Sequence, residues 1–198
     1  MNNIAPTHFP IDDRLATRWS PYVFSEQPVP RDTLRSVFEA ARWSASSFNE
    51  QPWRFLVSRK NRDDTHDRIV NCLAEGNQVW AKHAPVLLIG IYRHRFAESG
   101  KENKAAPHDL GLAAGQMVFE ASRHDLFVHM MIGLDPAAAR RTFGIPNDAE
   151  AYTAMAIGYR DAADNADASL REREAKPCQR LPQCDFVFSN QFGTSAEF

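Results

Sequence analysis

Ala45-Ser46-Ser47-Phe48-Asn49-Glu50-Gln51-Pro52-Trp53 is the most informative stretch of this sequence. Two hydroxyl groups and two carboxamides stand close together in it, at Ser46, Ser47, Asn49 and Gln51, directly before an aromatic residue. Carboxamides both donate and accept hydrogen bonds and hydroxyls rotate to fit, which suits the edge of a planar heterocycle such as a flavin or a pterin. The competing interpretation is a helix C-cap followed by an ordinary turn, because turns favour the same small polar residues.

The segments on either side of this polar stretch predict a helix before it and a strand after it. Apolar residues recur at helical spacing over residues 30–44, at Leu34, Val37, Phe38 and Ala41. Residues 53–57, Trp-Arg-Phe-Leu-Val, are largely apolar and typical of a strand. A polar loop between two regular elements is a common place for a binding site.

The rest of the chain predicts a mixture of helices and strands. Helices are expected over residues 64–74, 110–121 and 136–143, and strands over residues 85–92, 127–131 and 151–159. Within the 110–121 helix, Gly111 and Gly115 lie four apart and leave a face that another backbone can approach closely. A final apolar piece, residues 185–188, is also expected to be a strand, which a partner subunit could cover.

Length and composition favour one ordinary globular domain over residues 1–198. A hydrophobic fraction of 43% and a net charge of -2 argue against disorder and against a nucleic-acid partner. The longest apolar run, residues 84–92, is far shorter than the roughly 20 residues that span a membrane. The polar start lacks the features of a signal peptide, so a cytoplasmic protein is expected. The three cysteines have no metal-binding spacing, and neither a disulfide framework nor a metal site is expected.

A bound phosphate would have to be held by side chains, because the chain has neither a GxGxxG motif nor a P-loop. Arg18-Trp19-Ser20 offers a guanidinium and a hydroxyl for that purpose, although a solvated surface segment would look the same. His124 and His129 have the wrong spacing for one helical face and are interpreted as structural. No catalytic nucleophile is assigned, since no local signature of one is present.

Taken together, these segments resemble the FMN-dependent nitroreductase family from about Asp13 to Phe188. In that family an Arg-x-Ser motif contacts the FMN phosphate and ribityl chain, which implies these roles for Arg18, Trp19 and Ser20. The family's Pro-Ser-Ser-x-Asn-x-Gln-Pro-Trp loop is similar to residues 45–53. It normally reaches the flavin that is bound mainly by the other subunit, and this implies cofactor contacts for four residues: Ser46, Ser47, Asn49 and Gln51.

Two further segments complete the resemblance. Residues 130–135 resemble the stretch whose backbone lies beside the isoalloxazine ring, with Ile132 and Gly133 at the key places. Arg180-Leu181-Pro182 is similar to the basic motif that closes over the phosphate, which implies that Arg180 shares it with Arg18. The chain departs from the family pattern in three places: Ala45 replaces a proline, Cys178 stands where many members have a second basic residue, and Tyr22 stands where some have a lysine.

The resemblance implies an α+β fold: a mostly antiparallel sheet flanked by helices, in an intertwined homodimer that exchanges the C-terminal strand. The 110–121 helix would lie in the dimer core. The implied activity is ping-pong hydride transfer from NAD(P)H, through FMN, to nitroaromatics, quinones or similar electron-poor acceptors, with the cofactor carrying the chemistry. Two alternatives are another reaction on the same fold, such as dehalogenation or dehydrogenation, and a non-catalytic flavin-binding dimer.

Overall fold

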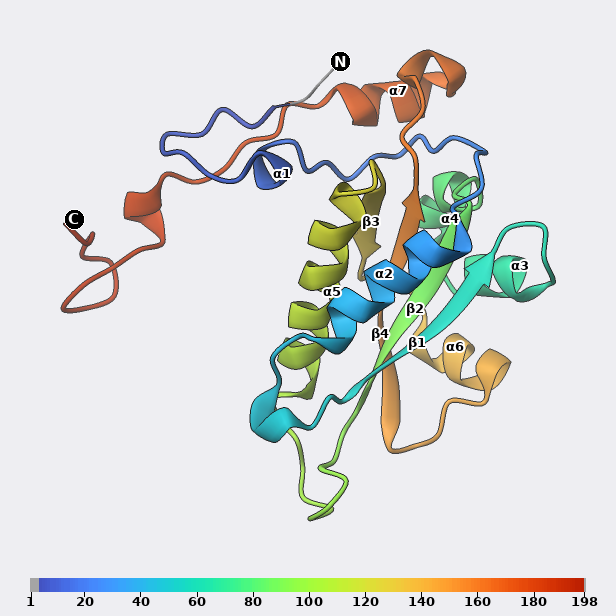
Figure 1. Ribbon diagram of the computed structural model, residues 1–198, viewed down its shortest axis with the longest axis horizontal. Coiled ribbons are helices and arrows are strands. Elements are labelled where there is room, and N and C mark those ends of the chain that lie inside the picture. Colours follow the sequence, from blue (N-terminus) through green and yellow to red (C-terminus); the bar gives the residue numbers. More distant parts are fainter. Residues whose placement is uncertain (1–3, 198) are drawn as a thin grey trace.

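A four-stranded antiparallel sheet forms the centre of the protein (Figure 1). The computed structural model describes residues 4–197. The strands are β1 (Trp53–Arg59), β2 (Val86–Arg93), β3 (Phe127–Met131) and β4 (Ala149–Gly158), and they lie in the order β1-β2-β4-β3. The predicted mostly antiparallel sheet is therefore confirmed.

Helices cover both faces of the sheet. The α-helices are α1 (Asp13–Ala16), α2 (Arg31–Arg42), α3 (Thr65–Val70), α4 (Glu75–Ala81), α5 (Ala106–Ser122), α6 (Pro136–Phe143) and α7 (Ala168–Ala175). Helices α2 and α5 pack against each other and share one apolar cluster with the sheet, whereas α3, α4 and α6 contribute to a second cluster on the opposite face. Short 3-10 helices occupy Ser47–Asn49, Ala163–Asn165 and Gln183–Asp185.

Strand β2 explains how one continuous apolar run serves two cores. Its side chains alternate between the sheet faces, so Val86 and Leu88 join the α2/α5 cluster while Leu87 and Ile89 join the other. All four are essentially inaccessible to solvent. A strand covered on both faces needs apolar residues at every position, and this is why the sequence shows no polar alternation here.

The predicted helix over residues 64–74 is divided into two helices. Helix α3 ends at Val70, and α4 begins at Glu75. Between them, Leu73 forms an isolated bridge with Leu134, and the backbone N–H of Ala74 donates to the Gly133 carbonyl across 2.9 Å. Pairing with this distant loop therefore replaces the helical hydrogen bonds that local periodicity alone would continue.

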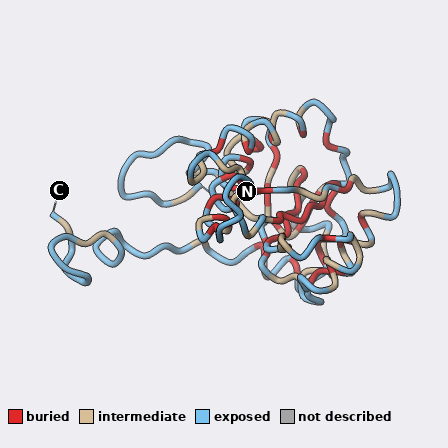
Figure 2. The backbone as a smooth tube through the Cα atoms, turned by 90° about the horizontal axis from the view of Figure 1, so that it is seen from below, coloured by how far each residue is buried: buried red, intermediate tan, exposed pale blue. Residues whose placement is uncertain are grey.

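The C-terminal segment leaves the body of the protein instead of joining its sheet (Figures 1 and 2). The strand predicted over residues 185–188 is not formed in the single chain. A 3-10 turn ends at Asp185, and Phe188 bridges to Ser195 within the same segment. Phe186 and Phe192 remain 58% and 94% exposed because no sheet edge of their own chain lies beside them. No helix within residues 4–197 is long and apolar enough to cross a membrane.

Candidate functional site

The Arg18-Trp19-Ser20 segment is half-buried and lies between α1 and the body of the protein. Arg18 Nη1 donates a hydrogen bond to Ser20 Oγ across 3.2 Å, so the guanidinium and the hydroxyl predicted to act together do lie together. The indole Nε1 of Trp19 turns the other way and donates to Glu174 Oε1 across 3.1 Å. The segment is thus a fixed structure and not a solvated loop.

Helix α7 and the end of β4 hold this segment in place. Glu174 is 3% exposed, and its second oxygen, Oε2, accepts the backbone N–H of Tyr22 at 2.8 Å. Arg160 Nε donates to Glu174 Oε1 at 2.8 Å, and the Arg160 guanidinium carbon lies 5.7 Å from the centre of the Trp19 ring. These contacts fix the chain on both sides of Ser20.

His129, on β3, supports the same segment from the sheet. Its Nδ1 lies 2.8 Å from the Pro21 carbonyl oxygen, and its ring packs between Tyr22 and Trp80 at centroid distances of 4.8 and 4.3 Å. Burial lowers the pKa of His129 below its ordinary value, and the Arg18 charge acts in the same direction, although the Pro21 carbonyl and Glu174 oppose it. The structural role predicted for this histidine agrees with these contacts.

The Ser46–Gln51 loop has an unusual backbone. Phe48, Asn49 and Gln51 all have positive φ angles, of 53°, 56° and 51°. Only asparagine among these three adopts this region with any ease, so the loop holds strain of about 1 kcal/mol or more for each of the others. Such conformations persist only where the surroundings determine them, and they cluster at ligand-binding sites.

Hydrogen bonds from two directions hold the strained loop. The Gln51 N–H donates to Ser46 Oγ at 3.1 Å, and the Ser47 N–H donates to Asp109 Oδ2 at 3.0 Å. Asp109 lies in the first turn of α5 and is 2% exposed. The segment between β2 and α5 adds a third support, because the Ala97 N–H donates to Glu50 Oε1 at 2.7 Å.

The Ile132-Gly133 pair forms the turn after β3. The Gly133 carbonyl accepts both the Ala74 N–H and Asn77 Nδ2, the latter at 3.0 Å. A Cβ atom at Gly133 would lie 2.6 Å from Asn77 Nδ2, so a side chain here would have to displace the Asn77 amide from the Gly133 carbonyl. Ile132 is 68% exposed, so the turn is accessible to solvent at this residue. The bonds from Ala74 and Asn77 fix the backbone of the turn at Gly133.

Arg18 lines a cavity of about 250 Å³ near the start of β3. The cavity wall includes Trp19 and Arg160, together with Ser122 in the last turn of α5. Its two guanidinium groups outnumber its one carboxylate, that of Asp125, so the cavity is suited to an anion such as a phosphate.

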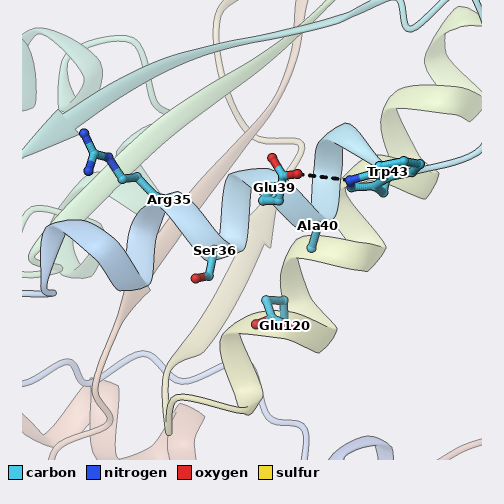
Figure 3. A pocket seen from close by; sticks show the side chains of 6 residues that line it. All are labelled: Arg35, Ser36, Glu39, Ala40, Trp43 and Glu120. Atoms are coloured by element: carbon cyan, nitrogen blue, oxygen red, sulfur yellow. Dashed lines mark hydrogen bonds between the residues drawn. The ribbon is translucent and has the colours of Figure 1, made fainter.

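A larger hollow, of about 550 Å³, lies between α2 and α5 (Figure 3). Glu39 and Glu120 line it, and hydrogen bonds from Arg42 and then Trp43 lower the pKa of Glu39 to about 2. None of the predicted cofactor residues lines this hollow, and its two carboxylates outnumber its one guanidinium, that of Arg35, so it suits a phosphate less. We therefore place the candidate site at the smaller cavity.

Helix α5 separates the Ser46–Gln51 loop from Arg18 within one chain. The loop bonds to Asp109 near the start of this helix, whereas the Arg18 cavity reaches Ser122 at its end. These two residues are about 20 Å apart along the helix axis. The two polar groups predicted to contact one cofactor do not meet in a single chain.

Arg180 also lies apart from Arg18 in the single chain. It is exposed on the C-terminal segment, where Nη1 donates to the Gln179 carbonyl at 2.7 Å and to Cys178 Sγ at 2.9 Å. Within residues 4–197 these are its hydrogen bonds, and both are local. The cation that does share the Arg18 cavity is Arg160, which the sequence did not single out.

The supporting residues could not be recognised from sequence. Glu174 stands among alternating charges in Arg171-Glu172-Arg173-Glu174, a pattern typical of a solvated helix. Asp109 resembles an ordinary acidic residue in the first turn of a helix. Among residues 4–197, no group of three His, Cys, Asp or Glu side chains is arranged to hold a metal ion.

The sequence and the fold match known proteins over most of the chain. The family model described as the nitroreductase family matches residues 15–159. A crystal structure described as an oxidoreductase containing FMN is 32% identical, with a TM-score of 0.90 and 98% of each chain covered. A nitroreductase family protein from Clostridium difficile 630 is 18% identical, with a TM-score of 0.72 and coverage of 92% of this chain and 99% of that one.

A named relative is also similar to most of the chain. The NADH dehydrogenase of Thermus thermophilus is 27% identical over 190 residues, which covers 80% of this chain and 85% of the relative. The two solved structures share the overall fold of this chain, an antiparallel sheet between two helical layers. The chain belongs to the nitroreductase family.

Proposed function

We propose that this chain is an FMN-dependent oxidoreductase that transfers hydride from NADH or NADPH to nitroaromatics, quinones or similar electron-poor acceptors by a ping-pong mechanism. The observation that carries the proposal is the 32% identity, over 98% of the chain, to an oxidoreductase that contains FMN. The name of the Thermus thermophilus relative supports a nicotinamide donor. FMN, when bound, supplies the hydride-transfer chemistry.

The residues of the chain fit the chemical groups of FMN. A phosphate needs charge-assisted donors, and Arg18, which is hydrogen-bonded to Ser20, provides one at a cavity that Arg160 also lines. The Ile132-Gly133 turn lies beyond the other end of β3, about 15 Å farther along that strand. An elongated ligand could therefore have its anionic end at Arg18 and its ring system at the turn.

The active unit is a homodimer, with α5 in the interface. One chain places the Ser46–Gln51 loop and the Arg18 cavity at opposite ends of α5, so a single site that uses both needs two chains. Two copies of α5 packed antiparallel would bring the start of each helix beside the end of the other. A Cβ atom at either Gly111 or Gly115 would meet nothing within 4 Å, which leaves this face open to a close partner helix.

The C-terminal segment has a place in the same assembly. The exposed Phe186 side chain gains cover if residues 186–188 exchange their local hydrogen bonds for a place in the sheet of the partner subunit. Exchange of this segment would also move Arg180 away from its own body and toward the partner. Arg180 could then share the phosphate with Arg18 of the partner subunit's site.

The protein side chains have a limited chemical task in this proposal. Arg18 and Ser20 bind the phosphate, and Ser46, Ser47, Asn49 and Gln51 of the partner subunit hold the ring edge. Because these hydrogen-bond donors are held rigidly, the cofactor is in position before the reaction begins. No acid–base pair is assigned among the side chains, since FMN supplies the hydride-transfer chemistry.

Three linked measurements on the purified protein test the proposal. We expect visible absorption of a bound flavin, one FMN per protomer, and oxidation of NADH or NADPH that depends on an added quinone. A colourless protein that does not take up FMN would contradict the whole proposal. FMN binding without turnover would instead support the non-catalytic flavin-binding dimer.

A further inference from the structure

Glu174 is a buried carboxylate at the meeting point of three segments that are distant in sequence. Its side chain is 2% exposed. Oε1 accepts from Trp19 Nε1 at 3.1 Å and from Arg160 Nε at 2.8 Å, and Oε2 accepts from the Tyr22 N–H at 2.8 Å. One side chain on α7 thus joins the N-terminal segment to the end of β4.

Such an arrangement is seldom a source of net stability. A buried ion pair loses so much hydration that apolar residues of similar volume often do as well or better. Its directional hydrogen bonds, however, fix the positions of the groups that they join. Glu174 bonds to residues on both sides of Ser20, so its effect falls on the local geometry of that residue and of Arg18.

The neighbouring contacts strengthen this interpretation. Arg173 lies over the Tyr22 ring, with its guanidinium carbon 5.5 Å from the ring centre. The Arg160 guanidinium lies over Trp19 in the same way and shares the cavity with Arg18. The N-terminal segment is thus held between α7 and Arg160. Arg160 comes directly after Tyr159, the last residue that the family model matches.

We infer that Glu174 is a positioning residue for the phosphate end of the cofactor site: it holds Trp19 and Tyr22 so that Arg18, which is hydrogen-bonded to Ser20, faces the cavity. This inference rests on the proposed FMN-binding function. Helix α7 lies beyond the residues that match the family model, and through Glu174 it then helps to position the phosphate-binding residues. Removal of the carboxylate lets the Arg18 guanidinium and the Ser20 hydroxyl move relative to the phosphate, whereas the ring end of the site is untouched.

The test is a pair of fluorescence titrations, with FMN and with riboflavin, on the wild type and on Glu174→Gln. An amide in place of the carboxylate directs an N–H toward one of the existing donors. We expect FMN affinity to fall by about tenfold or more and riboflavin affinity to stay nearly unchanged. A purely supporting role for Glu174 would lower both affinities together, and this result would overturn the inference, as would two unchanged affinities.

Two further variants make the result decisive. Trp19→Phe keeps an aromatic ring but removes one donor to Glu174, so it should show a smaller loss of the same selective kind, and it replaces Glu174→Gln if that variant does not fold. Glu172→Gln, at an exposed position on the same helix, is the matched control and should behave as the wild type. Failure of the proposed function is distinguishable, because the wild type itself would then bind neither ligand.

Discussion

The backbone N–H of Ser47 donates a hydrogen bond to the buried carboxylate of Asp109 across 3.0 Å. This bond joins the strained loop to the first turn of the longest helix. Asp109 is held from its other side, where Oδ1 lies 3.1 Å from His108 Nδ1. The loop therefore takes its position from α5, the same helix that we place at the subunit interface.

Asp109→Ala should lower the free energy of unfolding by about 2 kcal/mol, because the Ser47 N–H then has no acceptor. FMN binding should weaken as well, since the loop loses one of the bonds that hold its left-handed residues. Asp109→Asn keeps an oxygen of the same shape and should recover much of both. Urea unfolding and FMN titration check this expectation, and equal effects from both variants would contradict it.

Gly115→Leu tests the interface. A Cβ atom here meets nothing within 4 Å in the single chain, and leucine is the better helix former, so the protomer should fold normally. In the dimer the added side chain should block the partner helix and yield a monomer without flavin. Light scattering and circular dichroism measure the two effects.

Gly76→Leu is the matched control for that experiment. Gly76 also lies in a helix, with nothing within 4 Å of a Cβ atom, but on α4. Gly76→Leu should therefore fold normally and leave the dimer intact. A dimeric, flavin-loaded Gly115→Leu protein would show that the interface lies elsewhere.

Arg180→Ala should weaken FMN binding by roughly 30-fold or more and leave riboflavin binding nearly unchanged, as should Arg18→Ala. Loss of one partner from a charge-assisted pair typically costs about 2–5 kcal/mol. Arg180→Lys should recover only part, because an ammonium cannot make the planar two-point contact. Unchanged FMN affinity in Arg180→Ala would remove this residue from the site and leave Arg160 as the second cation.

A structural feature of this chain could be predicted from sequence where its cause lies in neighbouring residues, and could not where the cause lies far along the chain. The predicted bounds of β3 and α6 are correct, because Phe127–Met131 is a short and mostly apolar run that begins with two strand-forming residues and Asp135-Pro136 is a strong helix start. The left-handed backbone at Phe48 and Gln51 could not be predicted, since neither residue favours it and one bond that holds the loop comes from Asp109, about 60 positions away.

Long-range contacts also explain the other differences. The break between α3 and α4 follows from pairing with the Gly133 turn, and Glu174 gains its role from three distant donors. Residues 185–188 have the apolar pattern of a strand. A strand needs a sheet edge to pair with, however, and no sheet edge of the same chain lies beside this segment.

The pH dependence of stability should carry a contribution from His129. Burial lowers its pKa in the folded state, so the unfolded chain binds a proton more readily below about pH 6.5. The free energy of unfolding should therefore decrease as the pH falls through this range and be unaffected by this group above it. Urea unfolding at pH 8 and pH 5.5 should show that His129→Gln loses less stability on acidification than the wild type. An equal loss in both proteins would contradict this assignment.

The central claim is that each cofactor site combines Arg18 of one chain with the Ser46–Gln51 loop of the other, and mixed dimers test it most directly. Arg18→Ala and Asn49→Ala chains are co-expressed with different tags, and the dimer that carries both tags is isolated. Each homodimer should bind FMN weakly at both sites. In the mixed dimer the two defects fall in one site, so the account predicts one FMN per dimer bound with wild-type affinity. If the loop and Arg18 of the same chain formed the site, every site would carry one defect, and the absence of any high-affinity FMN in the mixed dimer would contradict the account.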